Sequence, residues 1–248
     1  MTKTIFISDT GSSALSYAAQ YLRRSGWAIA NEPGSNVTHL LLPIPSRITD
    51  QELNNLLRKL PENVTVIGGN LNHILPDRNR VWDLLQDESY LADNAAITAH
   101  CALQVAAQNL PVILNRQSVL ILGWGRIGKC LAQLLAAAGN QVTIAARKEK
   151  DRAMARSLMF DAIDPSTLAE QLEEFRVIFN TIPAPILTKE LITLCRPDCT
   201  LFELASVPGM DSDRAINARG LPGKLAPESS GNLIGQTILR LSHEKEGS

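Results

Sequence analysis

The stretch Ser118–Lys148, SVLILGWGRIGKCLAQLLAAAGNQVTIAARK, decides the fold class. Its first segment, SVLIL, is a near-continuous apolar run, which is typical of a parallel strand covered on both faces. The next segment, RIGKCLAQLLAAA, repeats apolar residues at the spacing of one helix face, and Gly139 follows as a helix stop. The last apolar segment, QVTIAA, predicts a second strand. The stretch is therefore predicted to form a strand, a glycine-rich turn, a helix and a second parallel strand.

The turn between the first strand and the helix fits the spacing GxGxxG. Gly123 permits the tight turn, Gly125 lets the backbone approach a pyrophosphate, and Gly128 lets the helix pack closely on the sheet. Free N–H groups at the helix start would then meet the phosphates. The alternative is a structural turn without a ligand. We predict a dinucleotide site whose cofactor-binding residues in the turn are Gly123, Trp124, Gly125, Arg126, Ile127 and Gly128.

Two of these residues keep a second interpretation. Trp124 lines the cofactor cleft or is ordinary packing, and Arg126 lies over the phosphates or points to solvent. Both alternatives stay open from the sequence.

Two basic residues, Arg147 and Lys148, follow the second strand. An NAD enzyme carries an Asp or Glu about 20 residues beyond the glycines, where it bonds the ribose hydroxyls. A guanidinium instead grips a phosphate through parallel hydrogen bonds. Such bonds contribute roughly 1.5–3 kcal/mol each. The pair therefore predicts NADP as the cofactor; the alternative is two solvated residues at a helix start.

The composition excludes several classes of protein. The chain has 248 residues, 45% hydrophobic and 20% charged, and its net charge of -1 indicates neither a nucleic-acid nor a membrane partner. We see no signal peptide and no apolar run long enough to span a bilayer, so we expect a cytoplasmic protein. Four scattered cysteines and four histidines show no ligand pattern, so we expect no metal.

Alternating strands and helices along the rest of the chain predict an α/β protein. We expect a Rossmann-type doubly wound parallel sheet and a smaller N-terminal α/β domain. Residues 1–93 form the N-terminal substrate or partner domain, and residues 94–248 form a connecting helix and the NADP-binding domain, with the final helix included. The irregular Asn70–Asn94, with Pro76, is expected to be a linker, and helices are expected at Ser166–Glu174 and Asp211–Gly220.

Several motifs together resemble the family of dipicolinate synthase large subunits, the A chains of that enzyme. The resemblance rests on LGWGRIGKCLAQLLAAAGNQVTIAARK, NTIPAPIL, LFELASVPG and GLPGKLAPESSGNLIGQTIL. It implies a flavodoxin-like N-terminal domain joined to an NADP-binding Rossmann domain, the arrangement of the D-2-hydroxyacid dehydrogenases. It also implies oxidation of a dihydrodipicolinate-type compound to dipicolinate in the cytoplasm of a sporulating mother cell. The implied partner is the small, flavoprotein-like second subunit of dipicolinate synthase.

The resemblance carries the family's motif onto individual residues. Besides the glycines, Arg147 and Lys148, these are Asn180, Thr181 and Ile182, which are candidates for cofactor binding, and Ser206, Pro222, Gly223 and Gly231. Four positions depart from the family pattern. The connecting helix of the family reads PTxEG, where this chain has ITAHC, with His100 and Cys101. The family's LASxPGG is LASVPGM here, with Val207 where a basic residue is usual and Met210 in place of a glycine.

Three residues are candidates for the chemistry of the substrate. His100 is a proton acceptor on the connecting helix or a helix histidine without a role. Ser206 hydrogen-bonds substrate or cofactor, or only ends its strand. Lys224 holds a substrate carboxylate, or is a solvated loop lysine. A small dicarboxylate is the expected substrate, and a homo-oligomer is expected because inter-domain helices of this kind often pair subunits.

Two other functions compete with the synthase. A D-2-hydroxyacid dehydrogenase needs a histidine late in the cofactor domain, and the chain has none between Ser206 and Leu241. A non-catalytic NADP-binding sensor or assembly subunit would explain a kept cofactor motif beside an altered substrate motif.

Overall fold

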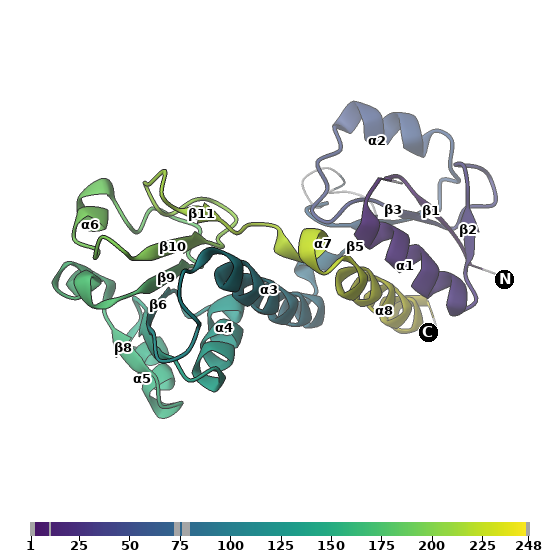
Figure 1. Cartoon of the computed structure of the whole chain (residues 1–248). Helices are drawn as coiled ribbons and strands as arrows, with labels where there is room; N and C mark the ends of the chain where they lie inside the picture. Colours follow the sequence, from purple (N-terminus) through teal and green to yellow (C-terminus); the bar gives the residue numbers. More distant parts are fainter. Residues whose placement is uncertain (1–2, 10, 72–74, 76–79, 247–248) are drawn as a thin grey trace. The chain divides into compact units, whose positions relative to one another are not determined.

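The computed structural model describes residues 3–9, 11–71, 75 and 80–246 (Figure 1). The chain divides into two compact units. Unit 1 comprises Met1–Asn94 together with Pro222–Ser248, and unit 2 comprises Ala95–Leu221. Each unit is built on one all-parallel sheet with helices between the strands, so the predicted α/β class is confirmed.

Unit 1 has a five-stranded sheet in the order β2-β1-β3-β4-β5. This is the 2-1-3-4-5 order of flavodoxin-like folds, as the resemblance implied. The strands are β1 (Thr4–Ile7), β2 (Ala28–Ala30), β3 (His39–Leu41), β4 (Thr65–Gly68) and β5 (Val81–Asp83). Its helices are α1 (Ser13–Arg24), α2 (Asp50–Leu57), the short η1 (Leu84–Gln86) and α8 (Pro227–Glu246). Two more helices, α3 (Glu88–Asn109) and α7 (Leu221–Leu225), run across the boundaries of the units.

Local sequence fixes the ends of the helices in unit 1. Ser12 caps α1 by accepting a hydrogen bond from the N–H of Leu15. Thr49 and Glu52 form the predicted capping box at the start of α2. The backbone and the side chain of Thr49 both bond to Glu52 and hold the pKa of that carboxyl below its usual value.

The final helix, α8, belongs to unit 1, although it was expected with residues 94–248. It lies beside α1 (Figure 1). Gly231 makes this contact possible, because a Cβ there would lie 2.3 Å from the carbonyl oxygen of Ala14 and 2.5 Å from the Cβ of Tyr17. One turn on, a Cβ at Gly235 would lie 2.7 Å from the ring of Tyr21. Gly231, carried over by the resemblance, is thus explained by helix packing.

Unit 2 has a six-stranded sheet in the order β11-β10-β9-β6-β7-β8. Numbered from β6, this is the 3-2-1-4-5-6 order of the Rossmann fold, which confirms the prediction. The strands are β6 (Ser118–Leu122), β7 (Gln141–Ala145), β8 (Asp161–Ile163), β9 (Val177–Asn180), β10 (Thr200–Glu203) and β11 (Ile216–Asn217). The helices are α4 (Arg126–Ala137), α5 (Glu149–Ser157), η2 (Pro165–Glu170), η3 (Leu172–Glu174) and α6 (Lys189–Thr193).

Three local predictions differ from the structure. Residues 211–220 were expected to be a helix, but they contain β11, because the chain pairs there with β10 and the N–H of Ala218 donates to the carbonyl of Glu203. The expected helix at residues 166–174 consists of two short 3₁₀ turns, η2 and η3. The expected linker at 70–94 contains β5, η1 and the start of α3, while Pro76 lies outside the described residues.

Candidate functional site

The order of the strands in unit 2 reverses between β6 and β9. In open α/β sheets, ligands bind outside the carboxyl ends of the strands at such a point. Leu122 ends β6 and Asn180 ends β9 at paired positions. Thr181, the next residue, ties the two ends together: its N–H and its hydroxyl both donate to the carbonyl of Leu122, at 3.0 and 2.8 Å. The glycine turn therefore lies at the switch point of the sheet.

Two glycines of the turn are required by the protein itself. Gly123 has a φ of +104°, and a Cβ there would lie 2.5 Å from the hydroxyl oxygen of Thr181. A Cβ on Gly128 would lie 2.4 Å from the carbonyl oxygen of Gly123. Both positions match the roles predicted from the spacing, a tight turn and a close helix-to-strand contact.

Gly125 has no such requirement. A Cβ there would meet no atom within 4 Å, and its φ of -79° suits any residue. Gly125 is the N-cap of α4, and as a glycine it has no side chain to cap the N–H groups of the first turn. Those groups are the donors that bind an anion at a helix start. The turn thus fits the pyrophosphate of a dinucleotide.

The other residues of the turn divide between packing and surface. Trp124 is only 8% exposed; its ring meets Phe160 edge-on at 5.8 Å, and the ammonium of Lys129 lies 5.9 Å from the ring centre. Its indole N–H has no hydrogen-bond partner among the described residues. The burial of Trp124 and its contact with Phe160 support packing as its role. Arg126 is exposed, and Ile127 is half-buried.

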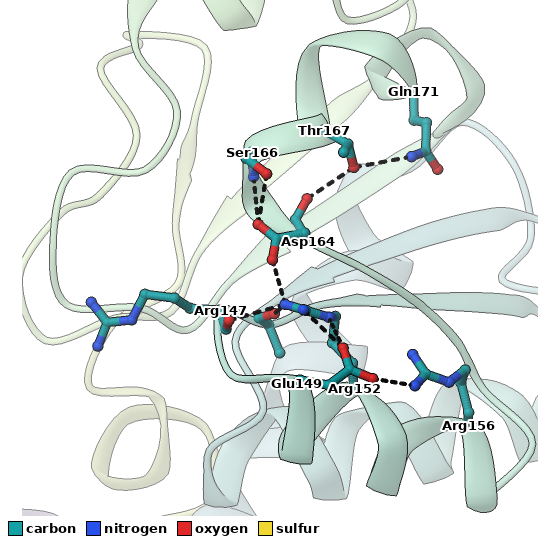
Figure 2. Close-up of polar contacts among 9 residues, drawn as sticks. Arg147, Glu149, Arg152, Arg156, Asp164, Ser166, Thr167 and Gln171 are labelled. Carbon is teal, nitrogen blue, oxygen red and sulfur yellow. Dashed lines mark hydrogen bonds and ion pairs between the residues drawn. The ribbon is translucent and has the colours of Figure 1, made fainter.

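Arg147 and Lys148 lie between the end of β7 and the start of α5, and both side chains are exposed. In Figure 2 the Arg147 side chain extends away from the neighbouring charged groups. Its guanidinium makes no hydrogen bond or ion pair with any residue that the structure describes. Lys148 is the N-cap of α5 and makes no side-chain cap bond. The structure thus presents two exposed cations where the prediction put the ribose phosphate.

A charged cluster beneath this loop was missed from the sequence. Arg152 donates from Nη1 to the carbonyls of Ala146 and Arg147, at 2.7 and 3.0 Å, and to Asp164 at 2.5 Å (Figure 2). Its Nε donates to Glu149 at 2.9 Å. The spacing of Glu149 and Arg152 on one helix signals their ion pair, whereas no sequence pattern indicates the contact with Asp164.

Asn180 is fully buried and bonded only to the protein. Its Nδ2 donates to the carbonyl of Ile182 at 3.1 Å and to both carboxylate oxygens of Glu203, at 2.9 and 3.1 Å. Its Oδ1 accepts the N–H of Ile182 at 2.9 Å. Asn180 therefore shapes the edge of the sheet, and these bonds leave its amide committed to that task.

Glu203, the last residue of β10, is the centre of this arrangement and was also missed. Its carboxylate is 5% exposed and accepts the N–H groups of Ala205, Gly209 and Met210, at 3.1, 2.8 and 3.1 Å. The loops after β9 and β10 also bond directly, since the carbonyl of Gly209 accepts the N–H of Ile186 at 2.8 Å. In the sequence, the only sign of this role of Glu203 was that a single acidic residue ends an apolar strand.

The remaining residues of the edge are exposed or in the core. Ser206 is exposed, and Val207 is 54% exposed. Met210 is 7% exposed and packs in the hydrophobic core of unit 2. Ile182 lies against the turn, since a Cβ on Gly123 would approach its side chain to 3.0 Å.

The other two catalytic candidates lie on helices. His100 is exposed on α3, and its side chain makes no hydrogen bond or ion pair with any residue that the structure describes. Its neighbour Cys101 is buried, and burial raises the pKa of its thiol. Lys224 is exposed on α7 and belongs to unit 1. Within unit 2, the structure brings together the glycines, Thr181 and Ile182 at the switch point, with Arg147 after the neighbouring strand β7.

Across residues 3–9, 11–71, 75 and 80–246, no group of three or more His, Cys, Asp or Glu side chains could hold a metal ion. Among the helices described, none is both long and apolar enough to cross a membrane.

Comparison with known families agrees with this geometry. Residues 94–196 match the family described as D-isomer specific 2-hydroxyacid dehydrogenase, NAD binding domain. The match covers the glycine turn, Arg147 and Asn180. It supports an oxidoreductase that uses a nicotinamide dinucleotide.

Individual relatives make the likeness more specific. The chain is 24% identical to the A chain of dipicolinate synthase from Bacillus subtilis (strain 168) over 201 aligned positions, and the match covers 76% of this chain and 68% of the relative. The crystal structure of the dipicolinate synthase A chain from Bacillus subtilis has a TM-score of 0.83 at 20% identity and covers 99% of this chain and 97% of its own. That of the A chain from Bacillus halodurans has a TM-score of 0.82 at 21% identity, covering 97% and 98%. The resemblance to the A chain of dipicolinate synthase is thus confirmed.

Proposed function

We propose that this chain is an NADP-dependent oxidoreductase that acts as the large subunit of a dipicolinate synthase. It would oxidise a dihydrodipicolinate-type dicarboxylate to dipicolinate together with a flavoprotein-like second subunit, in the cytoplasm of a sporulating cell. Similarity to the A chain of dipicolinate synthase supports the reaction. The observation that carries the choice of cofactor is the exposed Arg147 beside Lys148 at the end of β7, without an acidic side chain in their place.

The proposal gives each part of the edge a task. The N–H groups at the start of α4 hold the pyrophosphate over Gly125, and Arg147 and Lys148 hold the 2′-phosphate. Thr181 and Ile182 border the cofactor at the switch point. A bound NADP supplies the acceptor for the hydride that leaves the substrate ring.

Three residues are assigned to the substrate. Ser206 donates a hydrogen bond to it, Lys224 pairs with one carboxylate, and His100 accepts the proton released as the ring becomes aromatic. The proposal also makes unit 1 the substrate and partner domain, and it includes self-association of the chain.

The first experiment measures NADP and NAD binding side by side by calorimetric titration. The wild-type protein should prefer NADP by about ten- to a hundredfold, because one good contact to a charged phosphate is worth roughly 1.5–3 kcal/mol. Arg147→Asp should weaken NADP strongly and NAD little. Lys150→Asp, the same charge change at an exposed position of α5, is the matched control. Equal losses for both cofactors in Arg147→Asp would show that Arg147 does not read the 2′-phosphate.

Gly125 allows a second test that separates binding from folding. The protein has room for a Cβ at this position, so Gly125→Ala should change the free energy of unfolding by about 1 kcal/mol or less. The added methyl group lies where the pyrophosphate would approach, so affinity for both cofactors should fall. Unchanged affinity for both would contradict the placement of the pyrophosphate.

Turnover decides between the synthase and the alternatives. Formation of dipicolinate should require the chain, NADP and a candidate for the second subunit of the synthase. A non-catalytic NADP-binding subunit remains the second candidate, because Val207 stands where a basic residue is usual. NADP binding without turnover of any dicarboxylate, with the second subunit present, would favour that candidate. The absence of a histidine between Ser206 and Leu241 argues against a D-2-hydroxyacid dehydrogenase.

A further inference from the structure

Arg152 uses its guanidinium to hold the loop that carries Arg147. Its side chain is 15% exposed and lies under the loop. One nitrogen, Nη1, donates to two successive carbonyl oxygens, those of Ala146 and Arg147, at 2.7 and 3.0 Å. Bonds from a charged donor to backbone acceptors are stronger than neutral ones. The loop backbone is therefore held by Arg152 on one side, while the Arg147 side chain extends away on the other (Figure 2).

The same guanidinium pairs with two carboxylates. It contacts Glu149 at 2.8 Å and Asp164 at 2.5 Å. Hydrogen bonds from Arg156 and then from Arg152 lower the pKa of Glu149. The backbone N–H and the hydroxyl of Ser166, and then the charge of Arg152, lower the pKa of Asp164. Both carboxylates are thus ionised at neutral pH.

Ionised carboxylates beside a phosphate are unfavourable, because like charges repel and an acid at this place in the fold is what favours NAD. Glu149 comes two residues after Arg147 in the chain, and Asp164 follows β8, the strand beside β7. Without Arg152, the ribose phosphate would lie near two acids. Arg156 offsets only Glu149, since its guanidinium bonds to that residue at 2.6 Å.

We propose that Arg152 is a positioning residue that determines the choice of NADP over NAD, by fixing the loop of Arg147 and by offsetting the charge of Glu149 and Asp164. This inference rests on the proposed function, since it requires that the 2′-phosphate be bound by Arg147. Arg152 itself is not assigned a contact with the cofactor. Its effect is transmitted through the backbone and through the charges beneath the loop.

The experiment compares Arg152→Met and Arg152→Lys with the wild-type protein. Methionine keeps the apolar stem of the side chain and removes the charge and the hydrogen bonds. Lysine keeps the charge but lacks the planar fork that reaches several acceptors at once. Dissociation constants are measured for NADP and NAD, and also for adenosine 2′,5′-bisphosphate and AMP. The last two report the 2′-phosphate without the nicotinamide.

In Arg152→Met, the preference for the 2′-phosphorylated member of each pair should fall about tenfold or more, the equivalent of about one charged hydrogen bond. Arg152→Lys should lie between Arg152→Met and the wild-type protein. Arg196→Met is the control, because Arg196 also forms an ion pair in unit 2, with Asp198, just before β10 begins. It should leave the preference unchanged. Thermal unfolding of each variant establishes that it is folded.

The outcomes distinguish a failure of the inference from a failure of the proposed function on which it rests. A wild-type protein with no preference for NADP contradicts the proposed cofactor and the inference together. A wild-type preference that Arg147→Asp abolishes and Arg152→Met leaves intact contradicts the inference alone. Equal weakening of both members of each pair would mean that Arg152 only stabilises unit 2, and this result would also contradict the inference. If Arg152→Met does not fold, Arg152→Lys carries the test, and an unchanged ratio in that variant refutes the proposal.

Discussion

Replacing Glu203 with glutamine should destabilise unit 2 far more than a one-atom change suggests. The carboxylate accepts five hydrogen bonds, two at Oε1 and three at Oε2. A glutamine can place its oxygen at only one of these positions. If it keeps the Oε2 contacts, its amide nitrogen faces two donors, the N–H of Ala205 and the amide of Asn180. Buried bonds to a charged acceptor contribute roughly 1.5–3 kcal/mol each, and partial relaxation leaves an expected loss of about 2–4 kcal/mol.

The assay is hydrogen exchange of unit 2 as a function of denaturant, read from peptides that cover β6 and β9. Amides of Gly209 and Met210 should also lose protection under native conditions, because they donate directly to the carboxylate. Glu173→Gln, at an exposed position of the same unit, is the control and should change the free energy by less than about 0.5 kcal/mol. An effect of Glu203→Gln no larger than that of the control would refute the role given to this carboxylate.

Three further changes test other contacts. Gly231→Ala should lower the free energy of unfolding of unit 1 by about 1–3 kcal/mol in denaturant titrations, because the added Cβ would overlap α1. Gly223→Ala is the control and should not lower it, because a Cβ there meets no atom within 4 Å. Desolvation raises the pKa of Asp87, but hydrogen bonds from an arginine of α8 and a backbone N–H outweigh it and leave that pKa lowered. The ionised carboxylate of Asp87 therefore stabilises the folded protein at pH values above about 4, the pKa of an aspartate in the unfolded chain. This stabilisation is lost as the pH falls through the lowered pKa of the folded state. Unfolding measured across pH should show Asp87→Asn about 1 kcal/mol less stable at neutral pH and equal to wild type in strong acid. Val207→Lys should tighten dipicolinate binding about fivefold in calorimetry. Ile113→Lys, at another exposed position, is the control and should have no effect. Equal effects of the two changes would show a general response to charge.

The elements that were predicted correctly are those whose pattern is local and long. The stretch 118–148 contains a strand, a turn and a helix that each show their own periodicity, and all three are present in the structure. The strands that were missed, β2, β5, β8 and β11, have two or three residues each. So short a segment has no detectable alternation, and it becomes a strand only through its partner in the sheet. The helix expected at 211–220 failed for that reason, because pairing with β10 outweighs a modest helix propensity.

The residues of the candidate site divide in the same way, into those that a local pattern predicts and those whose contacts depend on the fold. The spacing of the glycines predicted which two the fold requires and which one leaves room for a ligand. Asn180 was expected to bind cofactor, but its amide is taken up by Ile182 and by Glu203, which is 23 residues away in sequence. Arg152 meets Asp164 across 12 residues. Contacts of this kind depend on the order of the strands, which periodicity does not encode.

Burial separates the residues of this edge into two kinds with different consequences for function. Asn180 and Glu203 are buried, and their polar atoms bond to the protein, so changes there alter the fold first. Arg147 and Val207 are exposed in the loops that follow β7 and β10, so changes there alter what the edge can bind. Met210 departs from the family pattern, yet its side chain fills the core and its N–H bonds to Glu203, which accounts for it structurally. Of the departures after β10, only Val207 is therefore expected to change the affinity for a dicarboxylate.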